Sequence, residues 1–184
     1  MRLFIFLVLC GAFISCEDDV VVKPSAMLRL EYEMPNYQAA LDDCPYSFEK
    51  NEQAIIQQKK DCWVNLYYPS MKATVYLTYQ SVQNNNLDSL LYDAQKLTYD
   101  HTIKADAIFE QPRVDSINKV YGMFYMINGN AATQSQFYVT DSIRHFVSGS
   151  LYFKSKPNFD SIYPAAVYLR NDIRHIMETI SWED

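Results

Sequence analysis

Alternating apolar and polar positions predict most of the strands in this sequence. Residues 27–33 alternate with period two, which is typical of a half-buried strand. Residues 63–67 and 73–79 are rich in aromatic and aliphatic side chains on either side of Tyr68-Pro69-Ser70, and they predict a hairpin. After Pro112, three more aromatic-rich runs predict an antiparallel meander, at residues 119–128, 134–140 and 146–153.

Two longer segments have the spacing of amphipathic helices. The first follows the capping sequence Asn84-Asn85-Asn86 and runs to about Lys104. The second covers residues 162–182 and places its aliphatic side chains on one broad face. Because strands and helices are interleaved without strict βαβ alternation, we expect a single α+β domain in which helices cover an antiparallel β-sheet. The order of elements loosely resembles the α/β/α sandwich of the PsbP-like fold.

The N-terminus predicts export and a lipid anchor. Arg2 is followed by eleven apolar or small residues, 3–13, which fall short of the roughly 20 needed for a membrane-spanning helix and fit a signal peptide. Ile14-Ser15-Cys16 resembles the lipobox of bacterial lipoproteins, which predicts lipidation of Cys16. The alternative is an ordinary secretory signal with an incidental cysteine. We therefore expect a signal peptide at 1–15, a tether at 16–26 and a folded domain at 27–184.

Charge and cysteine content narrow the class of protein further. A net charge of −6 and a pI near 5.0, with no basic block beyond Lys59-Lys60, argue against a nucleic-acid partner. The mature domain keeps Cys44 and Cys62 in a compartment that permits disulfides, and we expect them to be joined. Their separation of 18 residues would make the bridge worth roughly 3 kcal/mol in the loop-entropy model. The alternative is a reactive cysteine nucleophile.

The common catalytic and cofactor-binding motifs are missing from the sequence. It contains no Gly-x-Ser-x-Gly, His-Glu-x-x-His, Gly-x-x-x-x-Gly-Lys or Gly-x-Gly-x-x-Gly pattern, so we expect no enzyme and no cofactor. His175 lies between Asp172 and Glu178 at steps of three, a stripe that would suit a metal ion. The simpler interpretation is a solvated helix face, and we predict no metal site.

Polar residues are concentrated in segment 128–145, which makes it the first place to look for a ligand or catalytic surface. An envelope enzyme would require these residues to converge in one cleft, although the Ser-His-Asp types near its end are too close in sequence to point at one another. A glycan- or lipid-binding module would instead require the tyrosines of residues 121–138 to form an exposed patch. The candidate residues are Asn128, Asn130, Gln136, Asp141 and His145.

Asp-Ser followed by an aliphatic residue occurs four times. The pattern resembles the O-glycosylation acceptor of exported proteins in the Bacteroidota, where a glycan would add bulk and solubility at the surface. The alternative is that Asp-Ser caps helices and starts turns. The candidate acceptors are Ser89, Ser116, Ser142 and Ser161.

Several motifs lie in order along residues 44–161 and carry a resemblance to a known family. They include Cys44-Pro-Tyr-Ser-Phe-Glu49, Cys62-Trp-Val-Asn65, His101-Thr-Ile-Lys-Ala-Asp-Ala107, Asn128-Gly-Asn-Ala-Ala132, Gln136-Phe-Tyr-Val-Thr-Asp-Ser142 and Asp160-Ser161. Together they resemble the gliding motility lipoprotein GldD family of the Bacteroidota. The sequence departs from the family pattern at residues 23–30 and at Val147-Ser148.

The resemblance implies a function in the cell envelope. It implies a non-catalytic lipoprotein that supports the assembly or stability of the gliding motility and type IX secretion machinery, with other envelope proteins of that machinery as partners. The N-terminal lipid implies contact with a membrane, and we expect the outer membrane with the domain facing the periplasm. The cell surface is the alternative, because Glu17-Asp18-Asp19 resembles the surface-export signals of this phylum.

Overall fold

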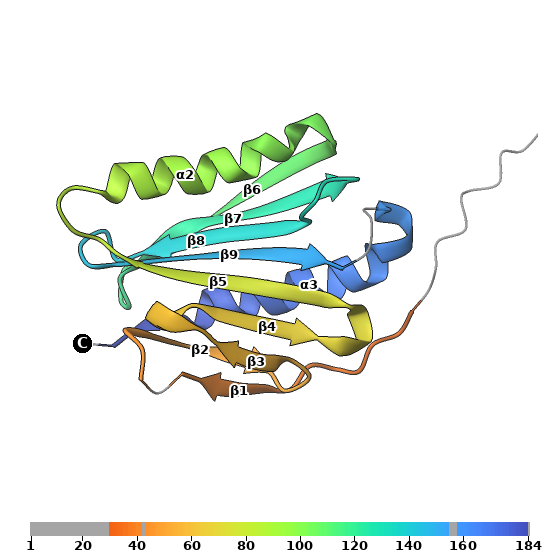
Figure 1. The fold of residues 1–184 in the computed structure, drawn as a ribbon, viewed down its shortest axis with the longest axis horizontal. Coiled ribbons are helices and arrows are strands. Elements are labelled where there is room, and N and C mark those ends of the chain that lie inside the picture. The colour runs from red at the N-terminus through yellow and green to blue at the C-terminus, as the bar shows by residue number, and fades with distance from the viewer. Residues whose placement is uncertain (1–29, 42, 155–157, 184) are drawn as a thin grey trace, which may run out of the picture.

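The computed structural model describes residues 30–41, 43–154 and 158–183. Within them, the main element is a seven-stranded antiparallel sheet in the order β3-β4-β5-β9-β8-β7-β6 (Figure 1). Its strands are β3 (Ile55–Gln58), β4 (Val64–Tyr68), β5 (Ala73–Ser81), β6 (Ala105–Asp115), β7 (Val120–Gly129), β8 (Ser135–Thr140) and β9 (His145–Phe153). Strand β9 returns to pair with β5 over nine residues. Strands β6, β7 and β8, which lie between β5 and β9 in the sequence, therefore follow β9 in the strand order and form one half of the sheet.

A smaller sheet is attached to the main one near the N-terminal part of the domain. It has the order β1-β2-β10 and consists of β1 (Tyr37–Ala40), β2 (Tyr46–Asn51) and β10 (Ser181–Trp182). A disulfide joins Cys44, just before β2, to Cys62 in the short 3-10 helix η2 (Lys60–Cys62) that precedes β4. The two Cα atoms are 5.7 Å apart, and the predicted pairing is confirmed. The bridge therefore links the small sheet to the large one.

Two α-helices cover opposite faces of the seven-stranded sheet. Helix α2 (Leu87–Tyr99), which continues as the 3-10 helix η4 (Asp100–Ile103), packs Leu90 against Tyr138 and Phe146. Helix α3 (Phe159–Thr179) packs against Phe137 and Val147, the neighbours of those two residues along β8 and β9. Successive side chains of a strand point to opposite faces, so the helices lie on different sides of the sheet, as Figure 1 shows. No helix in these described segments is long and apolar enough to cross a membrane.

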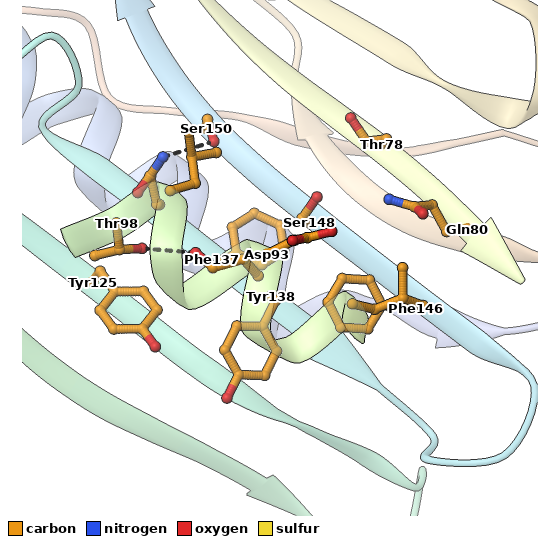
Figure 2. A pocket seen from close by; sticks show the side chains of 14 residues that line it. Thr78, Gln80, Asp93, Thr98, Tyr125, Phe137, Tyr138, Phe146, Ser148 and Ser150 are labelled. Carbon is orange, nitrogen blue, oxygen red and sulfur yellow. Dashed lines mark hydrogen bonds between the residues drawn. The ribbon is translucent and has the colours of Figure 1, made fainter. Parts of the chain in front are cut away.

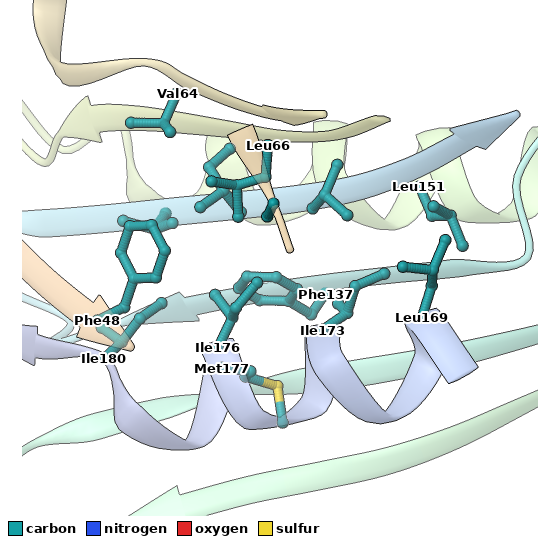
Figure 3. Packing of buried hydrophobic residues seen from close by; sticks show 14 of the residues in the cluster. Phe48, Val64, Leu66, Phe137, Leu151, Leu169, Ile173, Ile176, Met177 and Ile180 are labelled. Carbon is teal, nitrogen blue, oxygen red and sulfur yellow. The ribbon is translucent and has the colours of Figure 1, made fainter. Parts of the chain in front are cut away.

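The main core lies between α3, the small sheet and the inner face of the large sheet (Figure 3). Leu169, Ile173 and Ile176 form the buried stripe of α3 and are fully buried. They meet Phe137 from β8 and Phe48 from β2. Full burial of each such side chain stabilises the fold by about 1.5–3 kcal/mol, so this stripe fixes α3 on the sheet.

The expected fold class is confirmed, whereas one predicted strand and the end of one predicted helix are wrong. The hairpin appears as β4 and β5, joined through the 3-10 helix η3 (Pro69–Met71), and the meander as β7, β8 and β9. The strand predicted at residues 27–33 is not formed in its described part, because residues 30–33 pair with no strand and Tyr32 packs against Tyr168 instead, with ring centroids 5.1 Å apart. The second helix ends at Thr179, and β10 follows because Ile180 leaves the helical conformation with ψ of 128°.

Candidate functional site

Asn128 and Asn130 lie where β7 ends and α3 begins. Asn128 Oδ1 accepts a hydrogen bond from Arg170 Nη2 at 3.0 Å. Asn130 Oδ1 accepts one from the backbone N–H of Phe159, the first residue of α3, at 2.9 Å. A side-chain oxygen on a first-turn N–H satisfies a group that the helix itself leaves without a partner. These two predicted site residues therefore fasten α3 to the sheet.

Asp141 and His145 lie at the opposite end of β8, in the turn to β9. Asp141 Oδ1 accepts hydrogen bonds from the backbone N–H groups of residues 143–145 at 2.8–2.9 Å. Burial would raise the pKa of Asp141, but these N–H groups and nearby His145 outweigh it and lower the pKa below its usual value. A 3.0 Å hydrogen bond joins His145 Nδ1 to the Tyr79 hydroxyl, and the imidazole stacks on Trp182. The pair thus shapes the turn and holds β10.

Gln136 lies between these two ends, on the opposite face of the sheet from α3. Its side chain is 3% exposed, and its Nε2 donates to Ser150 Oγ at 3.2 Å. Its Oε1 is buried and has no hydrogen-bond partner among the described residues. A buried acceptor without a partner costs about 1–3 kcal/mol, so it needs an explanation. The five predicted residues do not converge in one cleft, and the condition for an envelope enzyme is not met by them.

A cavity of about 230 Å³ lies beside Gln136, between α2 and the sheet (Figure 2). The helix contributes Leu90 and Ala94 to its lining, and Asp93 stands at its exposed rim. The sheet contributes hydroxyl, amide and aromatic side chains from β5, β7, β8 and β9. Sequence reasoning missed this cavity, because the residues that line it are spread over more than 70 positions of the chain, from Thr78 to Ser150.

The tyrosines of residues 121–138 do not form the exposed patch that a glycan- or lipid-binding module would require. Tyr125 and Tyr138 are buried under α2, and burial raises the pKa of Tyr125. Exposed aromatic side chains lie instead on β5 and just before β4. There Trp63 and Tyr76 are 47% and 43% exposed. Sequence reasoning assigned these residues to strands without distinguishing the two faces.

The helix stripe around His175 is only partly solvated. Glu178 is exposed and His175 Nε2 donates to Glu49 Oε2 at 2.7 Å, but Asp172 is only 1% exposed. The solvated-face interpretation is therefore wrong for Asp172. No group of three His, Cys, Asp or Glu side chains in the described segments is arranged to hold a metal ion.

Asp172 instead connects α3 to the small sheet. Its two carboxylate oxygens accept hydrogen bonds from the Tyr37 hydroxyl and from Asn51 Nδ2, each at 2.8 Å. Asn51 Nδ2 also lies 2.9 Å from the Tyr168 hydroxyl, to which it donates. Burial raises the pKa of Asp172, while the hydrogen bonds from Asn51 and Tyr37 oppose that rise. Nothing in the local sequence pattern indicated this buried network.

Strand β6 forms one edge of the seven-stranded sheet and is largely exposed along its 11 residues. Phe109 and Val114 are 51% and 70% exposed, and Ile103 just before the strand is 89% exposed. We call these three side chains and the strand the β6 edge surface. Pro112 and several charged residues also lie on β6, as is common on edge strands that must not aggregate. Pro112 and the charged residues therefore oppose aggregation along this edge, which still presents apolar side chains.

Comparison with known families connects this fold to a function. A direct comparison with curated protein sequences found no match. A family model described as gliding motility lipoprotein GldD matches residues 17–182 of the 184 residues, which is nearly all of the chain. Lipoproteins of this kind are components of the cell envelope. The chain belongs to the GldD family of gliding motility lipoproteins.

Proposed function

We propose that this protein is a non-catalytic assembly factor, anchored through lipidated Cys16 to the outer membrane with its domain facing the periplasm. In this role it supports the assembly or stability of the gliding motility and type IX secretion machinery by binding other envelope proteins. Family membership supports the link to gliding. The sequence of residues 1–16 supports the anchor.

The β6 edge surface is the observation that carries this proposal. An edge strand has unpaired backbone N–H and C=O groups, and an extended segment of another protein pairs with such groups by strand addition. Phe109 is opposite Met126 on β7, which packs against the α3 core, so Phe109 points to the face that holds α3. Val114 is opposite Tyr121 and points to the other face, which holds α2. Apolar contacts are thus available on both sides of an added strand.

Affinity capture from the native envelope tests this proposal. Phe109→Asp and Val114→Asp place a charge on exposed positions of the edge, where surface substitutions change stability by only about 0.5 kcal/mol. We expect each to reduce the co-purified gliding or secretion proteins at least severalfold. The matched control is Ile55→Asp on β3, the other edge of the same sheet, where the side chain is 52% exposed.

A Cys16→Ala variant tests the anchor in the same experiment, because it cannot carry the lipid. We expect it to lose co-purification while the domain remains folded. Equal capture by wild type, both β6 variants and the Ile55→Asp control would rule out the edge as the docking surface. Undiminished capture by Cys16→Ala would rule out the need for the anchor.

We also propose that at least one of the four Asp-Ser motifs carries an O-linked glycan on its serine. The four serines are all exposed. The motifs also have a structural role, since Asp115 and Asp141 cap turns and Asp88 and Asp160 lie in the first turns of helices. Exposure and local structure are compatible with both interpretations. Intact-mass spectrometry of the native protein showing only unmodified serines would end the glycosylation proposal.

A further inference from the structure

The floor of the cavity under α2 is made of two rows of side chains that cross the sheet. In the first row, Tyr76 faces Ser150, Ser150 faces Gln136, and Gln136 faces Tyr125 across neighbouring strands. Opposed residues in an antiparallel sheet point to the same face. The row therefore leads from the exposed aromatic part of the face, at Tyr76, to the buried part under α2, at Tyr125.

The second row supplies further polar groups. Thr78 faces Ser148, and Ser148 faces Tyr138, so two hydroxyls lie beside the first row (Figure 2). A hydroxyl both donates and accepts hydrogen bonds, and an amide such as Gln80 at the rim does the same. The cavity thus offers paired donors and acceptors, which is what a ligand with several hydroxyl groups requires.

Gln136 is the group in this floor that most needs a ligand. Its Nε2 is held by Ser150, while its Oε1 has no partner among the described residues and is buried. A ligand O–H or N–H at this position would satisfy the acceptor. Water is the competing occupant, because a polar cavity of about 230 Å³ is large enough to hold it.

The charge of the lining excludes anionic ligands. The described residues that line the cavity include no Lys, Arg or His, and the one ionisable carboxylate is that of Asp93 at the rim. A phosphate, sulfate or carboxylate ligand would therefore meet no cation and would be repelled at the entrance. A neutral ligand fits this lining.

Aromatic rings complete the site. Tyr138 and Phe146 are stacked with ring centroids 5.8 Å apart and an interplanar angle of 8°, and they line the cavity. Outside it, Tyr76 and Tyr152 form an edge-to-face pair, also at 5.8 Å. Phe146 and Tyr138 are 1% and 9% exposed and form the closed wall of the cavity, whereas the Tyr76 ring beside it is 43% exposed. An accessible aromatic ring next to hydroxyl and amide groups suits a sugar ring, which has apolar C–H faces and a rim of hydroxyls.

We propose that this cavity binds one ring of a neutral saccharide, with Gln136 as its central hydrogen-bonding residue. The volume lies below the roughly 300–1,000 Å³ of pockets for drug-sized ligands, so a single ring enters and the rest of the chain extends over Tyr76 and Tyr152. The inference does not depend on the proposed assembly role. Saccharide binding is on the α2 face, whereas the docking surface is the β6 edge.

Titration of the purified domain with neutral trisaccharides tests the proposal. The probes are chitotriose and maltotriose, and the anionic control is trigalacturonate, each followed by NMR shifts of backbone amides in β8 and β9. We expect at least one neutral probe to bind in the millimolar range or tighter and the anionic probe not to bind. Absence of shifts for both neutral probes at about 10 mM would overturn the proposal.

Gln136→Leu separates binding from folding. It removes the acceptor and one hydrogen bond, so we expect binding to weaken at least about tenfold, while the melting temperature stays equal or rises because a buried unsatisfied acceptor is gone. The matched control is Gln57→Leu, which lies at the exposed end of the same row, three strands beyond Ser150. Unchanged binding by Gln136→Leu would overturn the proposal. If that variant does not fold, Ser148→Val provides the second test with the same expected loss.

Discussion

Removing the carboxylate of Asp172 tests how the small sheet is held to α3. In Asp172→Ala the hydroxyl of Tyr37 and the amide of Asn51 each lose a 2.8 Å hydrogen bond to a carboxylate oxygen. Asn51 is fully buried, so the N–H that loses Asp172 cannot turn to water, and its Nδ2 keeps only the hydrogen bond to the Tyr168 hydroxyl. The variant therefore leaves polar groups unsatisfied inside the protein.

The expected cost follows from these contacts. Each buried group that loses its partner lowers the free energy of unfolding by about 1–3 kcal/mol. Removing the carboxylate also removes its own desolvation cost, which offsets part of that loss. We therefore expect the free energy of unfolding to fall by about 2–4 kcal/mol at pH 7. Tyr37→Phe removes one of the same hydrogen bonds, so the double variant should show a coupling energy of about 1 kcal/mol rather than additive losses.

Urea unfolding followed by circular dichroism measures both quantities. The control is Asp100→Ala, whose carboxylate pairs with Lys96 on the surface at 2.7 Å, with the two side chains 60% and 54% exposed. An exposed pair of this kind contributes less than about 1 kcal/mol. A loss in Asp172→Ala no larger than in this control would refute the reasoning, as would strict additivity with Tyr37→Phe.

The same variant has a defined pH dependence. The pKa of Asp172 is raised in the folded protein, chiefly by burial. Stability from such a carboxyl is fully present below its ordinary pKa and is lost as the pH rises through the folded-state value. The difference between wild type and Asp172→Ala should therefore be larger at about pH 4 than at about pH 8. The opposite trend would contradict the burial argument.

Three further predictions concern other parts of the fold. In Gly149→Ala the new Cβ would lie 2.1 Å from a Phe137 ring atom, so we expect a loss of about 1–3 kcal/mol in chemical unfolding, and a neutral result would contradict the packing of that ring. Replacing Cys44 and Cys62 together by alanine should lower stability by about 3 kcal/mol, and reductant should then no longer affect the melting temperature. Because the pKa of Asp141 is lowered, its contribution is present above its ordinary pKa and is lost on acidification, so the deficit of Asp141→Asn should shrink from about pH 6 to about pH 3.

The strands that sequence reasoning missed are those whose patterns are irregular. Strand β6 contains Pro112 and four charged residues, which normally argue against a strand, but an edge position tolerates both. Strand β2 contains Lys50 and Asn51, which are nevertheless buried. Lys50 Nζ donates to the carbonyl oxygens of Asn51 and Ala54, so burial is satisfied by contacts that no local pattern displays. The regular periodicity of α2 and α3, by contrast, is sufficient to predict that both helices exist.

The candidate site was predictable only in part. The polar segment 128–145 predicts Gln136 as a site residue, and Gln136 does line a cavity. The same segment predicts Asn130 and Asp141, yet these two residues cap a helix and a turn at opposite ends of β8. Proximity in sequence does not determine which end or face of a sheet a residue occupies. The cavity required the pairing of β5 with β9, which follows from the complete topology.

Photo-crosslinking in the native envelope tests the central claim that the β6 edge binds a partner. A photoreactive phenylalanine analogue is placed at Phe109 or Val114, and at Ile55 on the opposite edge as the control. The account predicts a specific adduct with a gliding or secretion component from the two β6 positions and no such adduct from Ile55. Adducts from Ile55 alone, or from none of the three positions in cells that assemble the machinery, would contradict it.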